Sequence, residues 1–266
     1  MTSHVSGLTA SPADDRIAQA RVAIVAPAYN EAANIARLLR ELDESSAGWQ
    51  YSARVIIADD GSTDDTVSIA QAHVGVLPVD VLPLGVNRGP GAALFAGLRR
   101  ALEDPDVDFV VTIESDTTCD LTAMPRMIAA ALAGSDVVQG SMHHPDGEMV
   151  HVSRLRTLTS RGASLMMRIV TGENLRTFTN LYRTFDAGFL RRSIEKRGDD
   201  LVSEPGFAGV TELLLKLCRD GARVVEVPIK LDADKRVDES KLPLVATIKA
   251  QLRVAWQALR FRIFGR

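Results

Sequence analysis

The sequence predicts an α/β protein with a doubly wound, mainly parallel sheet flanked by helices. Short apolar runs at 21–26, 54–58 and 110–113 have the continuous hydrophobicity of strands that are buried on both faces of a parallel sheet. Apolar residues at helical spacing follow each run, and alternating strands and helices are typical of βαβ units. At 266 residues the chain is long enough for one large domain of this class.

Composition limits the classes of function. The chain is 46% hydrophobic and 24% charged, as in an ordinary globular protein, and its net charge of −3 gives no argument for a nucleic-acid partner. No apolar run approaches the roughly 18 residues of a membrane span. Cys119 and Cys218 form no metal or disulfide pattern, which indicates a reducing, cytoplasmic setting.

The chain divides into three predicted parts. Residues 1–20 contain Asp14 and Asp15 and no long apolar run, so they are interpreted as a flexible leader rather than a signal peptide. The main domain is expected over 21–242. A basic amphipathic helix is expected over 243–266.

The first strand, 21–26, ends in Pro-Ala-Tyr-Asn-Glu at 27–31. Apolar residues at helical spacing follow from Ile35, which places this loop between a strand and a helix, with Asn30 as the expected N-cap. The loop is either a well-capped turn or the floor of a ligand site, with Tyr29 available to stack on a ligand.

The second strand, 54–58, ends in Asp-Asp-Gly-Ser-Thr-Asp-Asp at 59–65. Ser62 or Thr63 is the expected cap of the next helix. Asp59 or Asp60 could accept hydrogen bonds from a base or a ribose, although the same residues also make a common turn.

A third strand is expected over 79–84, at a sheet edge because Pro83 interrupts it. Asn-Arg-Gly-Pro-Gly follows at 87–91. Glycines there would leave bare N–H groups at a helix N-terminus, where an anion could bind beside Arg88. The alternative is close packing of the helix. The run is neither a Walker A loop nor a dinucleotide fingerprint.

The strand at 110–113 ends in Glu114, Ser115 and Asp116. Side chains at i and i+2 of a strand point to the same side, so the two carboxylates could converge just beyond the sheet edge. Such oxygen ligands suit Mg²⁺ or Mn²⁺ carrying a diphosphate, and the alternative is a solvated acidic loop. A helix over 121–133 and a strand at 137–138 are expected next.

Together these four motifs resemble family 2 glycosyltransferases of the GT-A fold. The resemblance implies an enzyme with a nucleotide-sugar donor and a divalent metal, Mg²⁺ or Mn²⁺, held by Asp116 with Glu114. It implies donor-binding positions along the four motifs: Pro27, Tyr29, Glu31, Asp59, Asp60, Arg88, Gly89, Glu114 and Ser115.

The second half resembles the dolichol-phosphate mannosyltransferase group, which includes bacterial polyprenyl-phosphate hexosyltransferases. The matching segments are 160–165, 179–185, 212–217, 225–229 and 236–241, and the resemblance covers 21–245. It implies inverting transfer of a hexose from a GDP- or UDP-sugar to a polyprenyl phosphate. Arg183 and Lys241 would join Asp116 as catalytic residues. The acceptor phosphate would contact four residues: Arg161, Lys235, Arg236 and Ser240.

The chain also departs from that group. Glu114 stands where Asp is usual, Met142 where Arg is usual and Thr177 where Asp is usual. The run at 117–121 differs, and the last motif is one residue shorter with Asp238 in place of Gly. We interpret His143, His144 and His151 as polar loop residues, because they lack a helical metal-ligand spacing.

Two alternatives to lipid glycosylation remain at this stage. The first is a family 2 transferase with a soluble acceptor, which would need a carboxylate base such as Glu204 or Glu212. The second is a nucleotide-sugar-binding protein that has lost turnover.

The C-terminal segment carries five basic residues and no acid from 247 to 266. Ile248, Leu252, Ala255 and Leu259 form one apolar stripe on a helical wheel, continued back to Leu244. Such a helix suits peripheral contact with the inner face of a membrane. It could instead dock on the domain or on a partner subunit, so a homo-oligomer stays open.

Overall fold

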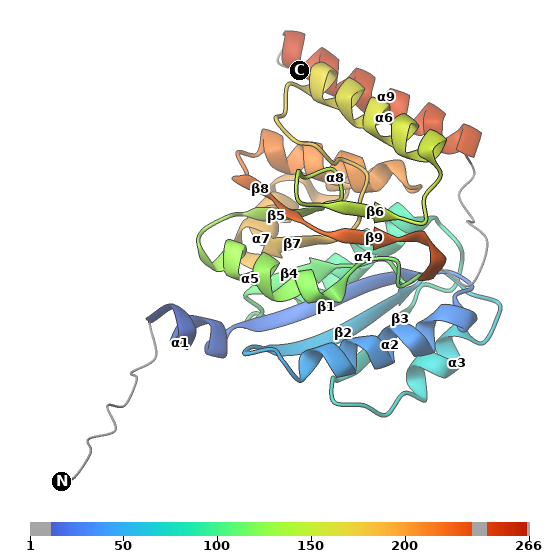
Figure 1. Cartoon of the computed structure of the whole chain (residues 1–266), viewed down its shortest axis with the longest axis vertical. Coiled ribbons are helices and arrows are strands. Elements are labelled where there is room, and N and C mark those ends of the chain that lie inside the picture. Colours follow the sequence, from blue (N-terminus) through green and yellow to red (C-terminus); the bar gives the residue numbers. More distant parts are fainter. Residues whose placement is uncertain (1–11, 236–243, 265–266) are drawn as a thin grey trace.

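The computed structural model describes residues 12–235 and 244–264. A seven-stranded sheet runs through the molecule in the order β3-β2-β1-β4-β7-β5-β8 (Figure 1). Six strands are parallel, and β7 runs antiparallel between β4 and β5. The strands are β1 (Arg21–Ala28), β2 (Ser52–Asp59), β3 (Val79–Pro83), β4 (Phe109–Thr112), β5 (Val137–Ser141), β7 (Arg183–Asp186) and β8 (Val224–Pro228). The predicted doubly wound, mainly parallel sheet is confirmed.

Helices cover both faces of the sheet because alternate strand residues point to opposite sides. Ile24 and Ile57 pack in one core beneath α2 and α5, whereas Val25 and Ile56 pack in the other with α4 and α8. The described helices are α1 (Pro12–Gln19), α2 (Ala32–Ser46), α3 (Thr66–Gln71), α4 (Pro90–Leu102), α5 (Met124–Leu132), α6 (Arg154–Thr171), α7 (Ala187–Arg197), α8 (Ala208–Arg219) and α9 (Leu244–Phe264).

Short elements complete the description. Strands β6 (Glu148–Val150) and β9 (Lys230–Asp232) form a separate parallel pair. Three 3₁₀ turns are η1 (Leu121–Ala123), η2 (Gly198–Leu201) and η3 (Ala233–Lys235). The helix expected over 121–133 is divided into η1 and α5, because Asp120 caps the first turn and Pro125 then starts a new helix.

The segment expected as a flexible leader, 1–20, contains a helix in its second half. Helix α1 spans Pro12–Gln19, where the Arg16 guanidinium donates to the Leu132 carbonyl at the end of α5. Ile17 packs against the adjacent core, which holds the helix to the domain. Residues 1–11 lie outside the described residues.

Helix α9 docks on the domain, and Ala255 is the one member of the predicted apolar stripe that is buried among the residues whose exposure the structure describes. Its buried face consists of Ala250, Val254, Ala255 and Ala258, while Ile248 and Leu252 are about half exposed. These small residues permit close packing on α6 and α8 (Figure 1). The larger apolar side chains therefore remain on the outer surface. None of the helices in the described ranges is long and apolar enough to span a bilayer.

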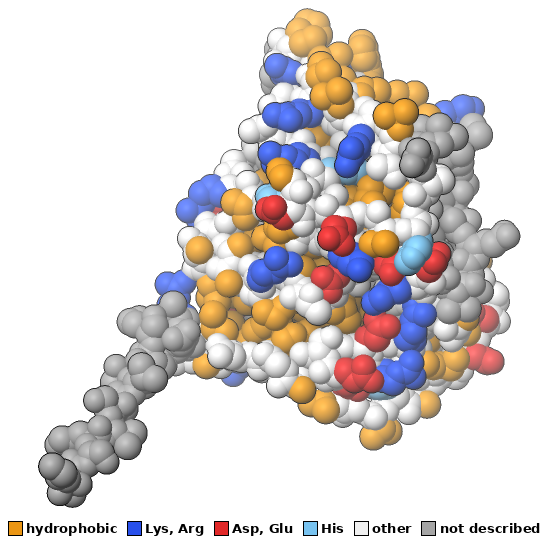
Figure 2. All heavy atoms as spheres, viewed as in Figure 1, with side chains coloured by type: hydrophobic (Ala, Val, Ile, Leu, Met, Phe, Trp, Pro, Cys, Tyr) orange, Lys and Arg blue, Asp and Glu red, His pale blue; other side chains and the backbone are white. Residues whose placement is uncertain are grey.

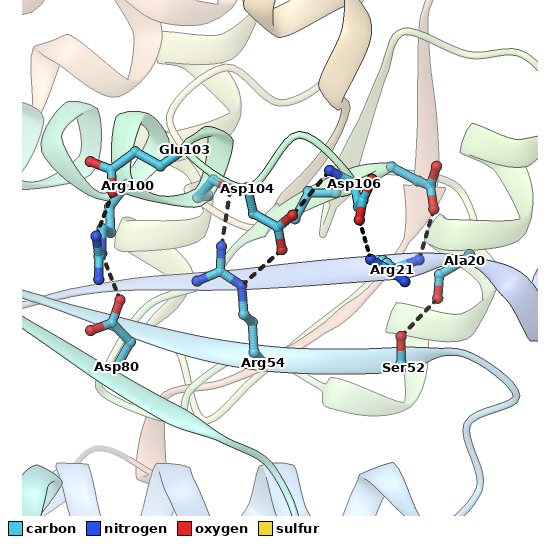
Figure 3. A network of polar contacts seen from close by, with 12 residues as sticks. Ala20, Arg21, Ser52, Arg54, Asp80, Arg100, Glu103, Asp104 and Asp106 are labelled. Atoms are coloured by element: carbon cyan, nitrogen blue, oxygen red, sulfur yellow. Dashed lines mark hydrogen bonds and ion pairs between the residues drawn. The ribbon is translucent and has the colours of Figure 1, made fainter.

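A network of ion pairs occupies the edge of the sheet where β1 and β2 begin (Figure 3). Arg21 pairs with Asp106 at 2.7 Å, and Arg100 pairs with Asp80 at 2.7 Å. These contacts tie the segment after α4 to β1, and α4 itself to β3. The pairs are partly exposed, so solvent screens them and each adds little to stability.

Helix α4 crosses the sheet closely at Gly97, where an added Cβ would collide with Val25 and lie 3.2 Å from the Ala58 Cβ. We expect Gly97→Val to lower the free energy of unfolding by about 1–3 kcal/mol, because this space cannot expand without moving α4. Gly162→Ala is the matched control, since nothing lies within 4 Å of an added Cβ there. It should be neutral or stabilising. Urea denaturation measures both, and equal stability of the two variants would contradict the packing argument.

Candidate active site

The four loop motifs meet at one edge of the sheet. Ala28 is paired with Asp59 in the parallel β1–β2 register, and Val25 is paired with Thr112 at the end of β4. Parallel strands direct their carboxyl ends to the same edge, where open α/β sheets bind ligands. The arrangement expected from the sequence is confirmed.

The first two loops are joined through Asn30. Its backbone N–H donates to the Ser62 hydroxyl at 2.8 Å, and its side-chain oxygen accepts from the Thr63 N–H at 2.8 Å. Asn30 has a φ of 53°, a left-handed conformation that asparagine tolerates. The predicted caps are wrong: Glu31 occupies the N-cap of α2 and Asp65 that of α3. Asn30 and Ser62 instead connect the loops.

Asp59 and Asp60 are both buried, each 2% exposed. Asp59 accepts from the Ser62 N–H at 3.2 Å, within its own loop. Asp60 reaches the third loop and accepts from the N–H groups of Arg88 and Gly89 at 2.8 and 2.7 Å. Asp60 therefore fixes the backbone of the third motif beside the second.

The anion site expected at the start of α4 is wrong. Asp60 occupies the N–H groups of Arg88 and Gly89, and the Pro205 carbonyl accepts from Gly91 at 2.7 Å and from Ala92 at 3.2 Å. An added Cβ at Gly91 would lie 2.5 Å from the Glu204 carbonyl oxygen. The glycines thus serve close packing, the second of the two interpretations. The Arg88 side chain is exposed and remains able to meet a ligand.

The acidic pair follows β4, and its members have different surroundings. Asp116 is 7% exposed, and its Oδ1 accepts from the N–H and hydroxyl of Thr118. Glu114 accepts from the Leu181 N–H and from the Cys119 thiol, each at 3.0 Å. Burial, assisted by the Asp116 charge, raises the pKa of Glu114. Burial also raises the pKa of Cys119, so its thiol remains protonated as a donor.

The backbone turns sharply after this pair. Thr117 has a φ of 60°, which is strained for a β-branched residue. Its buried hydroxyl has no hydrogen-bond partner within the described ranges. The turn places Thr118 and Cys119 back against the two carboxylates, as their hydrogen bonds show.

The residues present fit a hard cation that arrives with its substrate. Among the described residues no group of three His, Cys, Asp or Glu side chains could enclose an ion. Mg²⁺ commonly binds through one or two carboxylates and completes its coordination with substrate phosphates and water. Asp116 and Glu114 provide those carboxylates at the sheet edge.

The catalytic role expected for Arg183 is wrong, because its side chain is fully buried. The guanidinium donates to the Phe178 carbonyl at 2.7 Å, to the Val210 carbonyl and to the Gln139 side chain. Burial lowers the pKa of Arg183 to about 9, so the group stays charged at neutral pH. Arg183 cannot touch a substrate and instead joins β7, β5 and the start of α8.

Of the predicted acceptor residues, the structure describes Arg161 and Lys235. Arg161 is exposed on α6. Lys235 lies 3.6 Å from Glu41 on α2, and its carbonyl accepts from Arg37, so it belongs to the half of the molecule around β1. Arg236, Ser240 and Lys241 lie outside the described residues.

Met142 and Thr177, two residues that differ from those usual in the dolichol-phosphate mannosyltransferase group, contact each other. The Thr177 hydroxyl lies 2.8 Å from the Ser141 hydroxyl and 3.8 Å from the Met142 sulfur. Glu226 on β8 accepts from the Thr177 N–H at 2.9 Å. The substitutions at 142 and 177 are thus one local change. Sequence reasoning missed Glu226, which a lone acid in an apolar strand could have indicated.

The carboxylates considered as general bases are engaged elsewhere. Glu212 is 2% exposed, accepts from the N–H groups of Ser203 and Glu204, and pairs with Lys216 at 2.6 Å. Glu204 pairs with Arg253 on α9 at 3.0 Å. Both therefore stabilise the loop that covers the start of α4.

Two of the three histidines noted in the sequence pair with acids. His151 lies 2.7 Å from Asp232 and 3.4 Å from Asp234, and the His151–Asp232 contact raises the pKa of the imidazole. His144 lies 3.5 Å from Asp146. The third, His143, lies 3.0 Å from the Ser160 hydroxyl on α6.

Comparison with known proteins agrees with this geometry. Residues 23–198 match the family model described as glycosyl transferase family 2. The chain belongs to this family and is a glycosyltransferase with a GT-A-like sheet.

Individual relatives are more specific. The chain is 30% identical to an undecaprenyl-phosphate mannosyltransferase of Micrococcus luteus over 91% of this chain and 99% of that protein. It is 26% identical to a polyprenol monophosphomannose synthase of Mycolicibacterium smegmatis over 97% and 94% of the two chains. The fold is similar to glucosyl-3-phosphoglycerate synthase of Mycobacterium tuberculosis bound to Mn²⁺ and UDP-glucose, with a TM-score of 0.62, 20% identity, and coverage of 96% and 85%.

We expect Arg183→Met to destabilise the protein by about 3–5 kcal/mol, because three buried oxygen acceptors lose their donor. Arg192→Met on the exposed surface of α7 is the control, and it should change the free energy of unfolding by less than about 0.5 kcal/mol. Chemical denaturation provides the measurement. A variant of normal stability that lacks activity would restore the catalytic assignment of Arg183.

Proposed function

We propose that the protein transfers a hexose from a nucleotide diphosphate sugar to a polyprenyl phosphate, with inversion at the anomeric carbon. The principal support is the similarity, along nearly the whole chain, to a relative named as an undecaprenyl-phosphate mannosyltransferase. The site agrees in its chemistry, because it combines two carboxylates for a metal–diphosphate group with arginines further along the same edge.

The donor would lie over the loops that follow β1, β2 and β4. In this proposal Pro27, Tyr29 and Glu31 face the nucleotide together with Asp59 and Asp60. Arg88 extends from the third loop towards the diphosphate, with Gly89 and Ser115 beside it. The hydrogen bonds of Asn30 and Asp60 hold these loops in place before the donor binds, which reduces the ordering cost of binding.

Asp116 and Glu114 would hold Mg²⁺ or Mn²⁺, which when bound offsets the negative charge of the leaving nucleoside diphosphate. The Cys119 thiol and the Leu181 N–H orient the Glu114 carboxylate for this role. Because Glu is one methylene longer than Asp, it can reach the edge while keeping those contacts.

The acceptor phosphate oxygen attacks the anomeric carbon from the side opposite to the leaving group. A phosphate monoester is already anionic at pH 7, so this reaction needs no strong general base. That agrees with the engagement of Glu204 and Glu212 in structural ion pairs. The same observation argues against a soluble hydroxyl acceptor, which would require a base. Arg161, Lys235, Arg236, Ser240 and Lys241 remain proposed contacts of the acceptor or its phosphate.

Helices α6 and α9 would rest on the inner face of the membrane. Their sequences contain eight Lys and Arg residues and no Asp or Glu, in a chain whose net charge is −3. Leu158, Ile169, Leu252 and Trp256 are each more than half exposed. Figure 2 shows hydrophobic side chains gathered along this end of the molecule, with basic side chains nearby. Apolar and basic groups together favour an anionic lipid surface.

Turnover tests the proposed reaction. Purified protein is incubated with Mg²⁺ or Mn²⁺, GDP- or UDP-hexoses carrying labelled sugar, and polyprenyl phosphate. We expect label from one donor to enter the lipid phase, and Asp116→Ala to lower this rate by roughly 10³-fold because the leaving diphosphate loses its metal-mediated stabilisation. Asp106→Ala, in the ion-pair network at the opposite edge, should retain activity. If the protein binds the donor but forms no glycolipid, the proposed reaction is contradicted.

Vesicle flotation tests the membrane contact. The protein should float with phosphatidylglycerol vesicles and less with phosphatidylcholine vesicles, because α6 and α9 carry only basic charges. Replacing Leu252 and Trp256 by Glu should abolish flotation, since both side chains are exposed. The matched control replaces Val74 and Val76, which are exposed on the loop after α3, by Glu. An equal loss of flotation in both variants would contradict a specific contact of α6 and α9 with the membrane.

A further inference from the structure

A basic pocket lies beside the proposed transfer site. The cavity holds about 250 Å³ between the end of β5, helix α6 and the loop after it. Its lining includes His143, Arg161, Ser164, Leu165, Arg168 and Arg176. Three arginines around one small cavity provide the hydrogen-bond donors that a phosphate requires.

The pocket has an excess of positive charge. Arg161 makes no ion pair with any residue in the part of the chain that the structure describes, and Arg168 donates to the neutral Asn174 side chain. Arg176 alone faces an acid, Glu226, at 3.4 Å. Glu226 also accepts from the N–H groups of Arg176 and Thr177, so it orients this segment. Three cations against one carboxylate match a phosphate monoester of charge about −2.

His143 adds an unused polar atom. Its Nε2 lies 3.0 Å from the Ser160 hydroxyl, whereas its buried Nδ1 has no partner among the described residues. Burial and the neighbouring Arg161 charge lower the pKa of His143, so the ring is neutral at pH 7. A bound anion would provide the missing partner if the ring donated from Nδ1. A neutral ring also adds no charge, so the arginines dominate the binding of an anion.

The position of the pocket suits an acceptor. Strands β4 and β5 both pair with β7, with Thr112 and Gln139 opposite the same residue, Arg183. Thr112 and Gln139 therefore lie level and about 10 Å apart, two strand spacings, and β5 continues to Ser141. Asp116 follows β4, and His143 follows β5. The proposed donor loops follow β1 and β2, which lie on the opposite side of β4 from β5. A group in the pocket would therefore approach Asp116 from the side that the donor does not occupy.

An apolar surface leads away from the pocket. Leu165 lines the cavity and is 57% exposed, and Leu158 and Ile169 continue an exposed stripe at helical spacing along α6. A free phosphate would make no use of this stripe. A phosphate that carries a hydrocarbon chain would place its anionic end among the arginines and its chain along α6, towards α9 and the lipid surface.

We propose that the pocket formed by His143, Arg161, Arg168 and Arg176 binds the phosphate of a phosphorylated lipid, whose chain leaves along Leu165 and the exposed face of α6. This inference rests on the proposed function, for which it identifies the seat of the acceptor. Of the two described residues in the acceptor set expected from the sequence, Arg161 lines the pocket and Lys235 does not.

Binding is measured without turnover. Farnesyl phosphate is titrated into the full-length protein by isothermal calorimetry, with farnesol and inorganic phosphate as parallel probes. We expect farnesyl phosphate to bind and the two partial ligands to bind at least tenfold more weakly. Arg161→Gln and Arg176→Gln should each weaken farnesyl phosphate binding by about tenfold, the loss expected for one charge-assisted contact. Arg192→Gln on α7 is the matched control and should bind as the original protein does.

The possible outcomes separate the two proposals. Unchanged binding in Arg161→Gln, an exposed position where folding is safe, would overturn the pocket. Equal affinity for inorganic phosphate and farnesyl phosphate would overturn its assignment to a lipid. Arginine-dependent binding of farnesyl phosphate without sugar transfer would support the pocket and contradict the transferase reaction. Transfer with an acceptor KM unchanged in both variants would support the reaction and contradict the pocket.

Discussion

The hydrogen bonds of the buried Arg183 guanidinium hold together the half of the sheet that contains β5 and β7. A cation inside a protein is costly unless its donors are satisfied, and here two carbonyls and one side-chain amide oxygen accept from it. These acceptors come from β5, α8 and the loop before β7, so one side chain fixes three segments. The same loop contributes the Leu181 N–H that orients Glu114. Arg183 therefore connects the core to the loop that contacts Glu114, one of the two carboxylates proposed to hold the metal, and its own side chain is buried away from the surface.

The loops of the proposed donor site are held differently, by hydrogen bonds from polar side chains to backbone groups of neighbouring loops. Asn30 joins the first loop to the second, and Asp60 joins the second to the third. The Pro205 carbonyl then closes the start of α4. Asp60 and the Pro205 carbonyl accept from the N–H groups of the glycine-rich loop, so this loop does not offer bare N–H groups to a ligand. Preformed loops of this kind leave the exposed side chains, such as Arg88, to meet the ligand.

Charge and apolar surface are concentrated at one end of the fold. Helices α6 and α9 contain no acid, and their larger apolar residues face outward because α9 packs through alanines. The pocket opens on α6 within this layer. A surface that attracts anionic lipid and a cavity that accepts phosphate would then act together, since the surface raises the local concentration of the ligand that the cavity binds.

The sequence by itself determined the architecture and the edge at which the site forms. Continuous apolar runs identify buried parallel strands, and parallel strands necessarily bring their following loops to one edge, so Asp59, Asp60, Glu114 and Asp116 could be placed together in advance. Tertiary structure alone decided the role of each side chain. Arg183 and Glu212 are buried by segments distant in sequence, the N–H groups of Gly91 are occupied by Pro205, and α9 buries its alanines rather than its leucines. Such outcomes depend on which surfaces meet, and spacing along one chain segment does not contain that information.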